Sequence, residues 1–202
     1  MSKLSNEEDI NAATIAFEAY YTALGKVAHS WNHMQEELGF LFCNVTGLNN
    51  VTGMTIWHSL RSDLAQRSML RAVVEQKIAD DGWAKRFPRA TEIVELIKAI
   101  NTFSDRRNAA IHAPCSISIE APDFELLPFT FFGNPNAQKL IGKDILAEFD
   151  WYVRTANVCR LYISQLNAAL LVPRSAWPDK PHMPHRGEKN GPLDRQSPPK
   201  GH

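Results

Sequence analysis

The chain has 202 residues, which is enough for one well-buried hydrophobic core and short for two. Hydrophobic residues make up 44% and charged residues 22% of the sequence, as in an ordinary soluble domain. The formal net charge is zero, so the basic footprint of a nonspecific nucleic-acid-binding protein is missing and any RNA contact has to be local. Residues 1–8 are polar, without the apolar core of a secretion signal, and no apolar run approaches the ~20 residues of a membrane helix.

The cysteines and histidines offer little support for a metal site. Cys43, Cys115 and Cys159 are odd in number, far apart and without a CxxC pair, which favours reduced, mostly buried thiols in a cytoplasmic protein. His29 and His33 have the i,i+4 spacing of metal ligands, but the Glu of an HExxH motif and a third ligand are missing. We therefore expect a cytoplasmic protein without metal or cofactor that does not contact a membrane.

Apolar residues three and four apart predict a long first helix that ends near Gly47. Ser5 and Glu8 have the spacing of a capping box at its start. Because the helix is longer than a small bundle needs, a partner subunit is one natural place for the apolar surface that the bundle leaves uncovered.

A second helix is predicted over about residues 55–79, after a turn signal at residues 49–53. Arg67 falls in a gap of its apolar stripe. The simpler interpretation is a solvated or snorkelling arginine. The alternative is that Arg67 faces the same groove as His112 and helps to hold a phosphate.

A third helix should begin near Pro88 and end by Pro114. Its apolar residues recur at helical spacing, namely Ile93, Leu96, Ile97, Ile100 and Phe103. Continued, this stripe passes through Arg107 and Ile111. Because a buried charge is costly unless it is paired or solvated, Arg107 should lie in a cleft, at a subunit interface or beside an anion.

Asn108 and His112 are four residues apart and share one edge of that stripe. Arg107 and His112 lie about 140° apart around an ideal helix. However, arginine is long and Pro114 ends the helix, so both side chains can lean toward one groove.

Residues 115–141 interrupt the helical pattern with two short alternating or aromatic-rich stretches, which predict a small β-hairpin-like insert. Its phenylalanines could stack on bases, but anchoring the insert to the bundle is the favoured interpretation. A last long helix follows over about residues 142–171. Seven prolines among charges and glycines then predict a disordered or loosely tethered tail over residues 173–202. The predicted fold is all-α: an antiparallel bundle of four main helices within residues 1–172, with the insert before the last helix.

The end of the third helix, Arg107-Asn108-x-x-x-His112, resembles the Arg-x(4–6)-His signature of the HEPN superfamily, in which a polar residue commonly follows the Arg. The resemblance consists of this motif and a helix plan over roughly residues 5–172. It implies a helical bundle that is often dimeric. Many members are metal-independent ribonucleases, whereas others have lost catalysis and bind RNA, nucleotides or proteins.

The resemblance implies a metal-independent endoribonuclease of a toxin or phage-defence kind, with RNA and an antitoxin or regulatory protein as partners. His112 would act as general acid or base, Arg107 would stabilise the phosphate, and Asn108 would orient either group. Arg106 and Arg67 are weaker candidates for phosphate contacts. A homodimer would supply the second His112 that the reaction needs.

Two alternatives remain open. The first is a non-catalytic HEPN-like module that binds RNA, a nucleotide or a protein. The second is a helical interaction protein without a small-molecule site, in which His112 stabilises the helix terminus and Arg107 pairs with Asp105 or another carboxylate.

Overall fold

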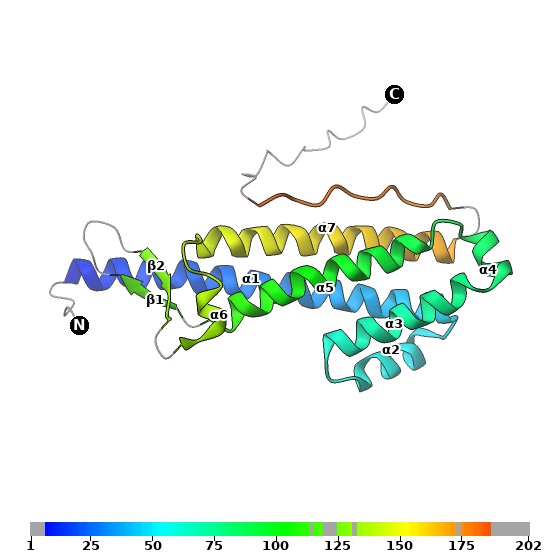
Figure 1. Cartoon of the computed structure of the whole chain (residues 1–202), viewed down its shortest axis with the longest axis horizontal. Coiled ribbons are helices and arrows are strands. Elements are labelled where there is room, and N and C mark those ends of the chain that lie inside the picture. The colour runs from blue at the N-terminus through cyan, green and yellow to red at the C-terminus, as the bar shows by residue number, and fades with distance from the viewer. Residues whose placement is uncertain (1–6, 114, 119–124, 131–132, 173–174, 187–202) are drawn as a thin grey trace, which may run out of the picture.

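A computed structural model describes residues 7–113, 115–118, 125–130, 133–172 and 175–186 (Figure 1). The helices are α1 (Glu7–Thr46), α2 (Asn50–Ser59), α3 (Asp63–Ile78), α4 (Asp81–Arg86), α5 (Thr91–Ile111), α6 (Pro135–Gln138) and α7 (Ile145–Leu171). Two short antiparallel strands, β1 (Cys115–Ser118) and β2 (Glu125–Pro128), lie between α5 and α6. The mostly helical fold with a small hairpin before the last long helix is confirmed. Among the described helices, none combines the length and apolarity that a membrane crossing requires.

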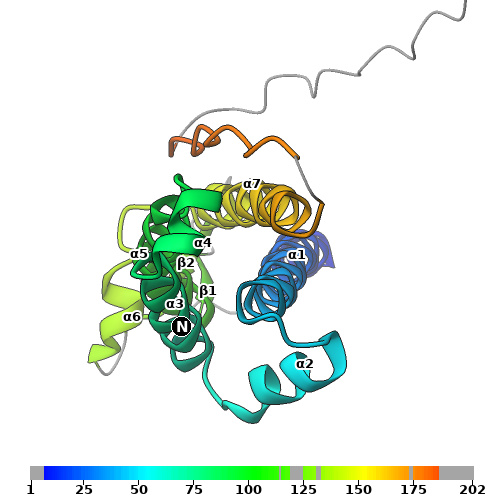
Figure 2. The same cartoon turned by 90° about the vertical axis from the view of Figure 1, so that its right-hand side faces the viewer.

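The two longest helices, α1 and α7, lie side by side and run in the same direction (Figures 1 and 2). Tyr20 contacts Phe149 in the first half of each helix, with ring centroids 5.7 Å apart. Asn44 donates to Asn167 near the end of each helix, at 2.9 Å. α5 runs opposite to both (Figure 1). The predicted antiparallel arrangement is therefore wrong for α1 and α7.

The reason is a break in the helix predicted over residues 55–79. Leu60 is extended, and the side chain of Ser62 caps α3 by accepting a first-turn N–H. Gln66 donates from Nε2 to the carbonyl oxygens of Trp57 and Leu60, at 3.0 and 3.4 Å, so carbonyls at the end of α2 are satisfied. One additional helix adds one additional change of direction, and α7 consequently runs parallel to α1.

The core lies along the shared faces of α1, α3, α5 and α7. The apolar stripe predicted on α5 is confirmed, because Ile93, Leu96, Ile97, Ile100 and Phe103 are all buried. α2 is held close to α1 at Gly53, where a Cβ atom would collide with Cys43 Sγ. The apolar stripe thus packs one face of α5 against α3 and α7, while the opposite face is exposed.

Several boundaries differ from the prediction. α5 begins at Thr91 rather than near Pro88, because the short helix α4 and a turn precede it. The capping residue Ser5 lies outside the described residues. So do Phe124, Phe131 and Phe132, and the base-stacking alternative for the insert therefore stays a prediction.

Residues 175–186, which we call the strap, pack against α5 and α7. This corrects the expectation that all of residues 173–202 lie outside the fold; residues 187–202 are outside the described part. The reason is that apolar anchors alternate with charges. Trp177 and Met183 pack on the core, Trp151 Nε1 donates to the carbonyl oxygen of Pro184 (2.8 Å), and Lys180 and Arg186 pair with carboxylates of the bundle.

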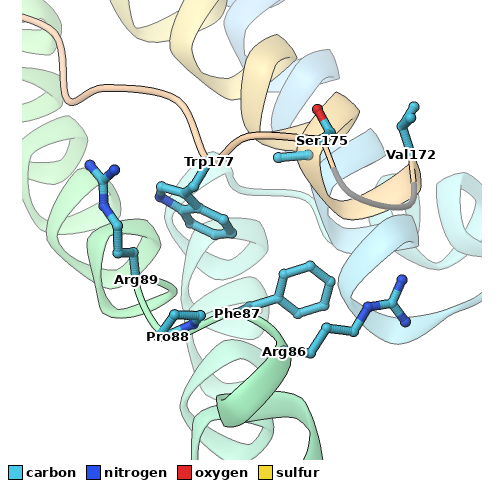
Figure 3. A pocket seen from close by; sticks show the side chains of 8 residues that line it. Arg86, Phe87, Pro88, Arg89, Val172, Ser175 and Trp177 are labelled. Atoms are coloured by element: carbon cyan, nitrogen blue, oxygen red, sulfur yellow. The ribbon is translucent and has the colours of Figure 1, made fainter.

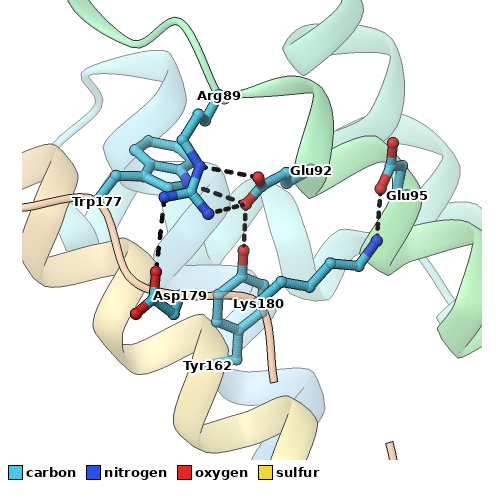
Figure 4. A network of polar contacts seen from close by, with 7 residues as sticks. All are labelled: Arg89, Glu92, Glu95, Tyr162, Trp177, Asp179 and Lys180. Carbon is cyan, nitrogen blue, oxygen red and sulfur yellow. Dashed lines mark hydrogen bonds and ion pairs between the residues drawn. The ribbon is translucent and has the colours of Figure 1, made fainter. Parts of the chain in front are cut away.

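Glu92 on α5 is the polar centre of the strap's attachment (Figure 4). It accepts hydrogen bonds from Tyr162 (2.7 Å), Trp177 Nε1 (3.1 Å) and Arg89 Nε (2.9 Å). Burial opposes its ionised form, but the bonds from Tyr162, Arg89 and Trp177 outweigh this effect and hold the pKa of Glu92 below its ordinary value. The carboxylate of Glu92 thus fastens the strap, and three hydrogen-bond donors stabilise its negative charge.

Replacing Trp177 with alanine should release the strap. We expect the free energy of unfolding in urea to fall by about 1–3 kcal/mol, because a half-buried aromatic anchor and its hydrogen bond are lost. Cys159 Sγ lies 4.0 Å from Met183 Sδ of the strap, and burial raises the pKa of this thiol to about 12. Trp177→Ala should therefore also make Cys159 react faster with a thiol reagent. Unchanged stability and labelling would contradict this anchoring role.

Candidate functional site

A polar cleft lies where the first turn of α3 faces the second half of α5. Its volume is about 320 Å³. Ser62, Asp63, Leu64 and Arg67 line it from the α3 side, and Asn101, Ser104, Asp105 and Asn108 from the α5 side. All but Leu64 are polar or charged, which suits a polar ligand rather than an apolar one.

Arg67 is the most deeply buried charged residue of the cleft, with 2% of its surface exposed. Its Nε donates to Asn101 Oδ1 (2.7 Å) and its Nη2 to Ser104 Oγ (3.3 Å), whereas the buried Nη1 has no partner among the described residues. Burial lowers the pKa of Arg67, because the low-dielectric surroundings disfavour its charge. The simpler interpretation of Arg67 as a solvated or snorkelling arginine is therefore wrong.

Arg107 approaches from α5 and is half-buried. Its Nη1 donates to Asn108 Oδ1 at 2.6 Å, while its buried Nε has no partner in the described part of the chain. Burial lowers the pKa of this guanidinium, and the Asp63 carboxylate partly opposes the effect. Arg107 is not among the residues that line the cleft, although its partner Asn108 is, so the cleft predicted for Arg107 stays a prediction.

Trp31 of α1 joins the two arginines. The Cζ atom of Arg107 lies 4.6 Å, and that of Arg67 5.5 Å, from the centroid of the indole ring, close enough for cation–π attraction. Trp31 Nε1 donates to Asp63 Oδ2 at 2.7 Å. Within the described residues, neither guanidinium has a carboxylate oxygen within 4.0 Å, although Asp63 is the acidic group that most strongly favours both charges. Asp63 is thus the main counter-charge of one buried and one half-buried guanidinium.

His112 lies at the C-terminal cap of α5, outside the cleft lining. Its backbone N–H donates to the carbonyl oxygen of Asn108 at 3.0 Å, and its side chain is exposed. Arg106 is also exposed and does not line the cleft. The structure thus brings Arg67, Arg107 and Asn108 together and leaves His112 one helical turn beyond Asn108.

Sequence reasoning missed Trp31, Asp63, Asn101 and Ser104. Trp31 fits the apolar seam of α1, so its pattern indicated only a core residue. The signal for Asp63 was the Ser62-Asp63 pair, a helix-start sequence inside an apparently continuous helix. Asn101 and Ser104 lie three residues apart on α5, and the sequence alone does not show which residues of other helices such polar side chains contact.

The other polar clusters have simpler explanations. His29 and His33 are exposed with ring centroids 4.2 Å apart, and the described residues contain no group of three or more His, Cys, Asp and Glu that could hold a metal. A cavity of about 410 Å³ lies beside Trp177 of the strap, with Arg86 and Arg89 at its rim (Figure 3). There Arg89 is paired with Glu92 and Arg86 stacks on Phe87. Neither is as deeply buried as Arg67, and neither has a buried donor without a partner among the described residues.

The shared charge of Asp63 can be measured by a double-mutant cycle. Asp63→Asn should lower the free energy of unfolding by about 2 kcal/mol, because both guanidiniums lose their main counter-charge. In an Arg107→Gln background only one guanidinium remains, so the same change should cost about 1 kcal/mol less. Urea titrations of the four proteins test this. Asp81→Asn, at an exposed position outside the cleft lining, is the matched control, and strict additivity would contradict a shared charge.

Chemically, the cleft offers guanidinium and amide donors to an anion, and the neighbouring His112 offers an imidazole that can exchange protons. Comparison of the chain with protein-family models, curated proteins and solved structures finds no match.

Proposed function

We propose that the chain is a metal-independent endoribonuclease of the HEPN type that acts in the cytoplasm as a homodimer. In this proposal α1, α3, α5 and α7 form the four-helix bundle of that type. Arg107, Asn108 and His112 form the catalytic group, and Arg67 and Arg106 contribute phosphate contacts. A toxin or phage-defence role, with an antitoxin or regulatory partner, belongs to the same proposal and rests on the resemblance of the motif.

The reaction needs two proton transfers and one fixed positive charge. A base removes the proton of the ribose 2′-hydroxyl, and the 2′-oxygen attacks phosphorus while the bond to the 5′-oxygen breaks. An acid protonates the departing 5′-oxygen, which leaves a 2′,3′-cyclic phosphate and a 5′-hydroxyl. A guanidinium stabilises the additional negative charge on the phosphoryl oxygens. Histidine and arginine are suited to these two tasks.

One observation carries the proposal. Arg107 keeps a guanidinium at the end of α5 without a carboxylate within 4.0 Å among the described residues, held instead by Asn108 and the Trp31 ring. In particular, the ion pair with Asp105 that a purely structural role would favour is not formed. An exposed imidazole follows one turn beyond Asn108. This combination supports a group that binds an anion beside a group that transfers protons.

A second copy of the chain is needed because one chain offers a single histidine in the motif. The exposed position of His112 at the end of α5 leaves it accessible to a partner's His112 across a two-fold axis. The composite site would then contain two imidazoles and two guanidiniums. That set supplies both proton-transfer groups without a metal ion.

The alternative is a non-catalytic module that binds RNA, a nucleotide or a protein. It is favoured by the position of His112 outside the cleft lining and by the inward stacking of Arg107 on Trp31. Under this alternative the cleft retains a ligand but no bond is broken. A helical interaction protein without any ligand site is the third possibility, and it predicts neither binding nor cleavage.

His112→Ala should abolish cleavage of labelled RNA in the presence of EDTA, because proton transfer is lost while the cleft stays intact. The rate should fall by at least about 100-fold. The matched control is His182→Ala, which removes an exposed histidine of the strap and should leave the rate unchanged. Equal cleavage by both variants would point to a contaminating nuclease. Retention of RNA by the wild-type chain without any cleavage would favour the binding module.

If the active site is composite, an inactive subunit should inactivate the wild-type subunit with which it forms a dimer. When wild-type chains exchange subunits with excess His112→Ala chains, the cleavage rate per wild-type chain should fall toward zero, because mixed dimers hold one imidazole instead of two. The rate is measured as the ratio of the two chains is varied at constant total concentration. Activity that simply follows the amount of wild-type chain would mean that each subunit contains a complete site.

A further inference from the structure

We propose that the cleft between α3 and α5 is a binding site for a phosphate group, with Arg67 as its central cation. This deepens the proposed function, on which it rests only for RNA as the natural source of the phosphate. The proposed reaction needs Arg107 and His112 at the end of α5. The site inferred here is centred on Arg67 and Asn101, which the motif does not contain, and it shares Asn108 with the motif.

The first support is the unused donor capacity of Arg67. Its side chain is almost completely buried and lines the cleft, yet Nη1 has no partner among the described residues. A buried guanidinium that leaves donors unpaired is costly. A phosphate oxygen beside Nη1 would supply the missing acceptor.

The second support is the orientation of the two asparagines. Asn101 Oδ1 accepts from Arg67 Nε, and Asn108 Oδ1 accepts from Arg107 Nη1. Since the carbonyl oxygens are occupied by cations, the Nδ2 groups remain as donors in the cleft lining. The amide groups therefore match an anion rather than a cation.

The third support is the N-terminus of α3, a helix of 16 residues. The N–H groups of Ala65 and Gln66 are satisfied by the side chain and the carbonyl oxygen of Ser62. Those of Asp63 and Leu64 belong to the first turn, where helix geometry supplies no acceptor, and both residues line the cleft. Helix N-termini of this kind bind phosphate through free N–H groups and the helix dipole.

Two carboxylates also line the cleft beside the one guanidinium of Arg67, so an anion would be bound by the unpaired donors at the buried end and not by an excess of positive charge. Asp63 already accepts from Trp31 Nε1, and it faces two guanidiniums rather than one. Asp105 is exposed, so water screens its charge. The donor without a partner, Arg67 Nη1, lies at the buried end of this group. A cleft of about 320 Å³ also leaves room for the sugar attached to a phosphate.

The decisive variant is Asn101→Asp. A carboxylate at this position would pair with Arg67 Nε, where the amide oxygen now lies at 2.7 Å, and would repel a bound anion. We expect affinity for inorganic phosphate to fall by at least about tenfold while the thermal midpoint of the unliganded chain rises. A residue with only a structural role would not give this opposite pair of effects. Arg67→Lys keeps a positive charge and should weaken binding less than Asn101→Asp.

Binding is measured by titrating the full chain with inorganic phosphate at constant ionic strength. The NMR signal of the Trp31 indole N–H serves as a local probe, because this group contacts Asp63 in the cleft lining. Arg71→Gln is the matched control, since it removes an exposed α3 arginine paired with Glu75. A second titration uses a 2′-O-methyl RNA oligonucleotide without terminal phosphates, which cannot be cleaved. A response to the oligonucleotide alone identifies the phosphodiester as the source, and a response to phosphate alone identifies a free phosphate.

The inference is overturned if neither probe moves the Trp31 signal, or if Asn101→Asp responds as the wild type does. Its failure is distinguishable from failure of the proposed function. Phosphate binding without RNA cleavage would leave the site standing and remove the enzyme. Cleavage that depends on His112 but not on Asn101 or Arg67 would leave the enzyme standing and remove the site.

Discussion

The arrangement of the site depends on Trp31, a side chain of α1 that contacts α3 and α5 through cation–π attraction and a hydrogen bond as well as through apolar packing. Two guanidiniums lie over its ring and one carboxylate accepts from its indole N–H. An indole has a negative face and a positive edge, so it can attract cations and an anion at the same time. Its edge-on contact with Phe103 continues this junction into the core. Arg67 and Arg107 are thereby held close together despite their like charges.

The break between α2 and α3 creates the N-terminus of α3, which lines one side of the polar cleft. A continuous helix over residues 55–79 would have no N-terminus at Asp63 and no free N–H groups beside Arg67. The extended Leu60 and the cap at Ser62 create this N-terminus, and Gln66 closes the end of α2. The same break reverses the chain once more and makes α1 and α7 parallel. One local feature therefore determines both the topology and the polarity of the cleft.

The sequence predicted what depends on a regular pattern and missed what depends on partners distant along the chain. The stripe of α5 was readable because five apolar residues repeat at helical spacing, whereas the cleft predicted at Arg107 is lined by its neighbour Asn108 instead. Arg67 stayed ambiguous, since burial of an isolated arginine is decided by Asn101, Ser104 and Trp31 on other helices. The strap was missed for a related reason. Its proline content is typical of a disordered tail, whereas its attachment comes from Trp177, Lys180 and Arg186 meeting acceptors on α5 and α7.

The separation between the cleft and His112 has a consequence for how binding and chemistry are related. Within one chain, the groups proposed to hold a phosphate line the cleft between α3 and α5, whereas the imidazole is exposed at the end of α5. A chain on its own would thus bind its ligand without a second proton-transfer group beside it. Under the proposed function, activity then depends on subunit association and falls with dilution below the dimer dissociation constant. A net charge of zero adds little long-range attraction for RNA, so retention depends on the few donors of the cleft rather than on a basic surface.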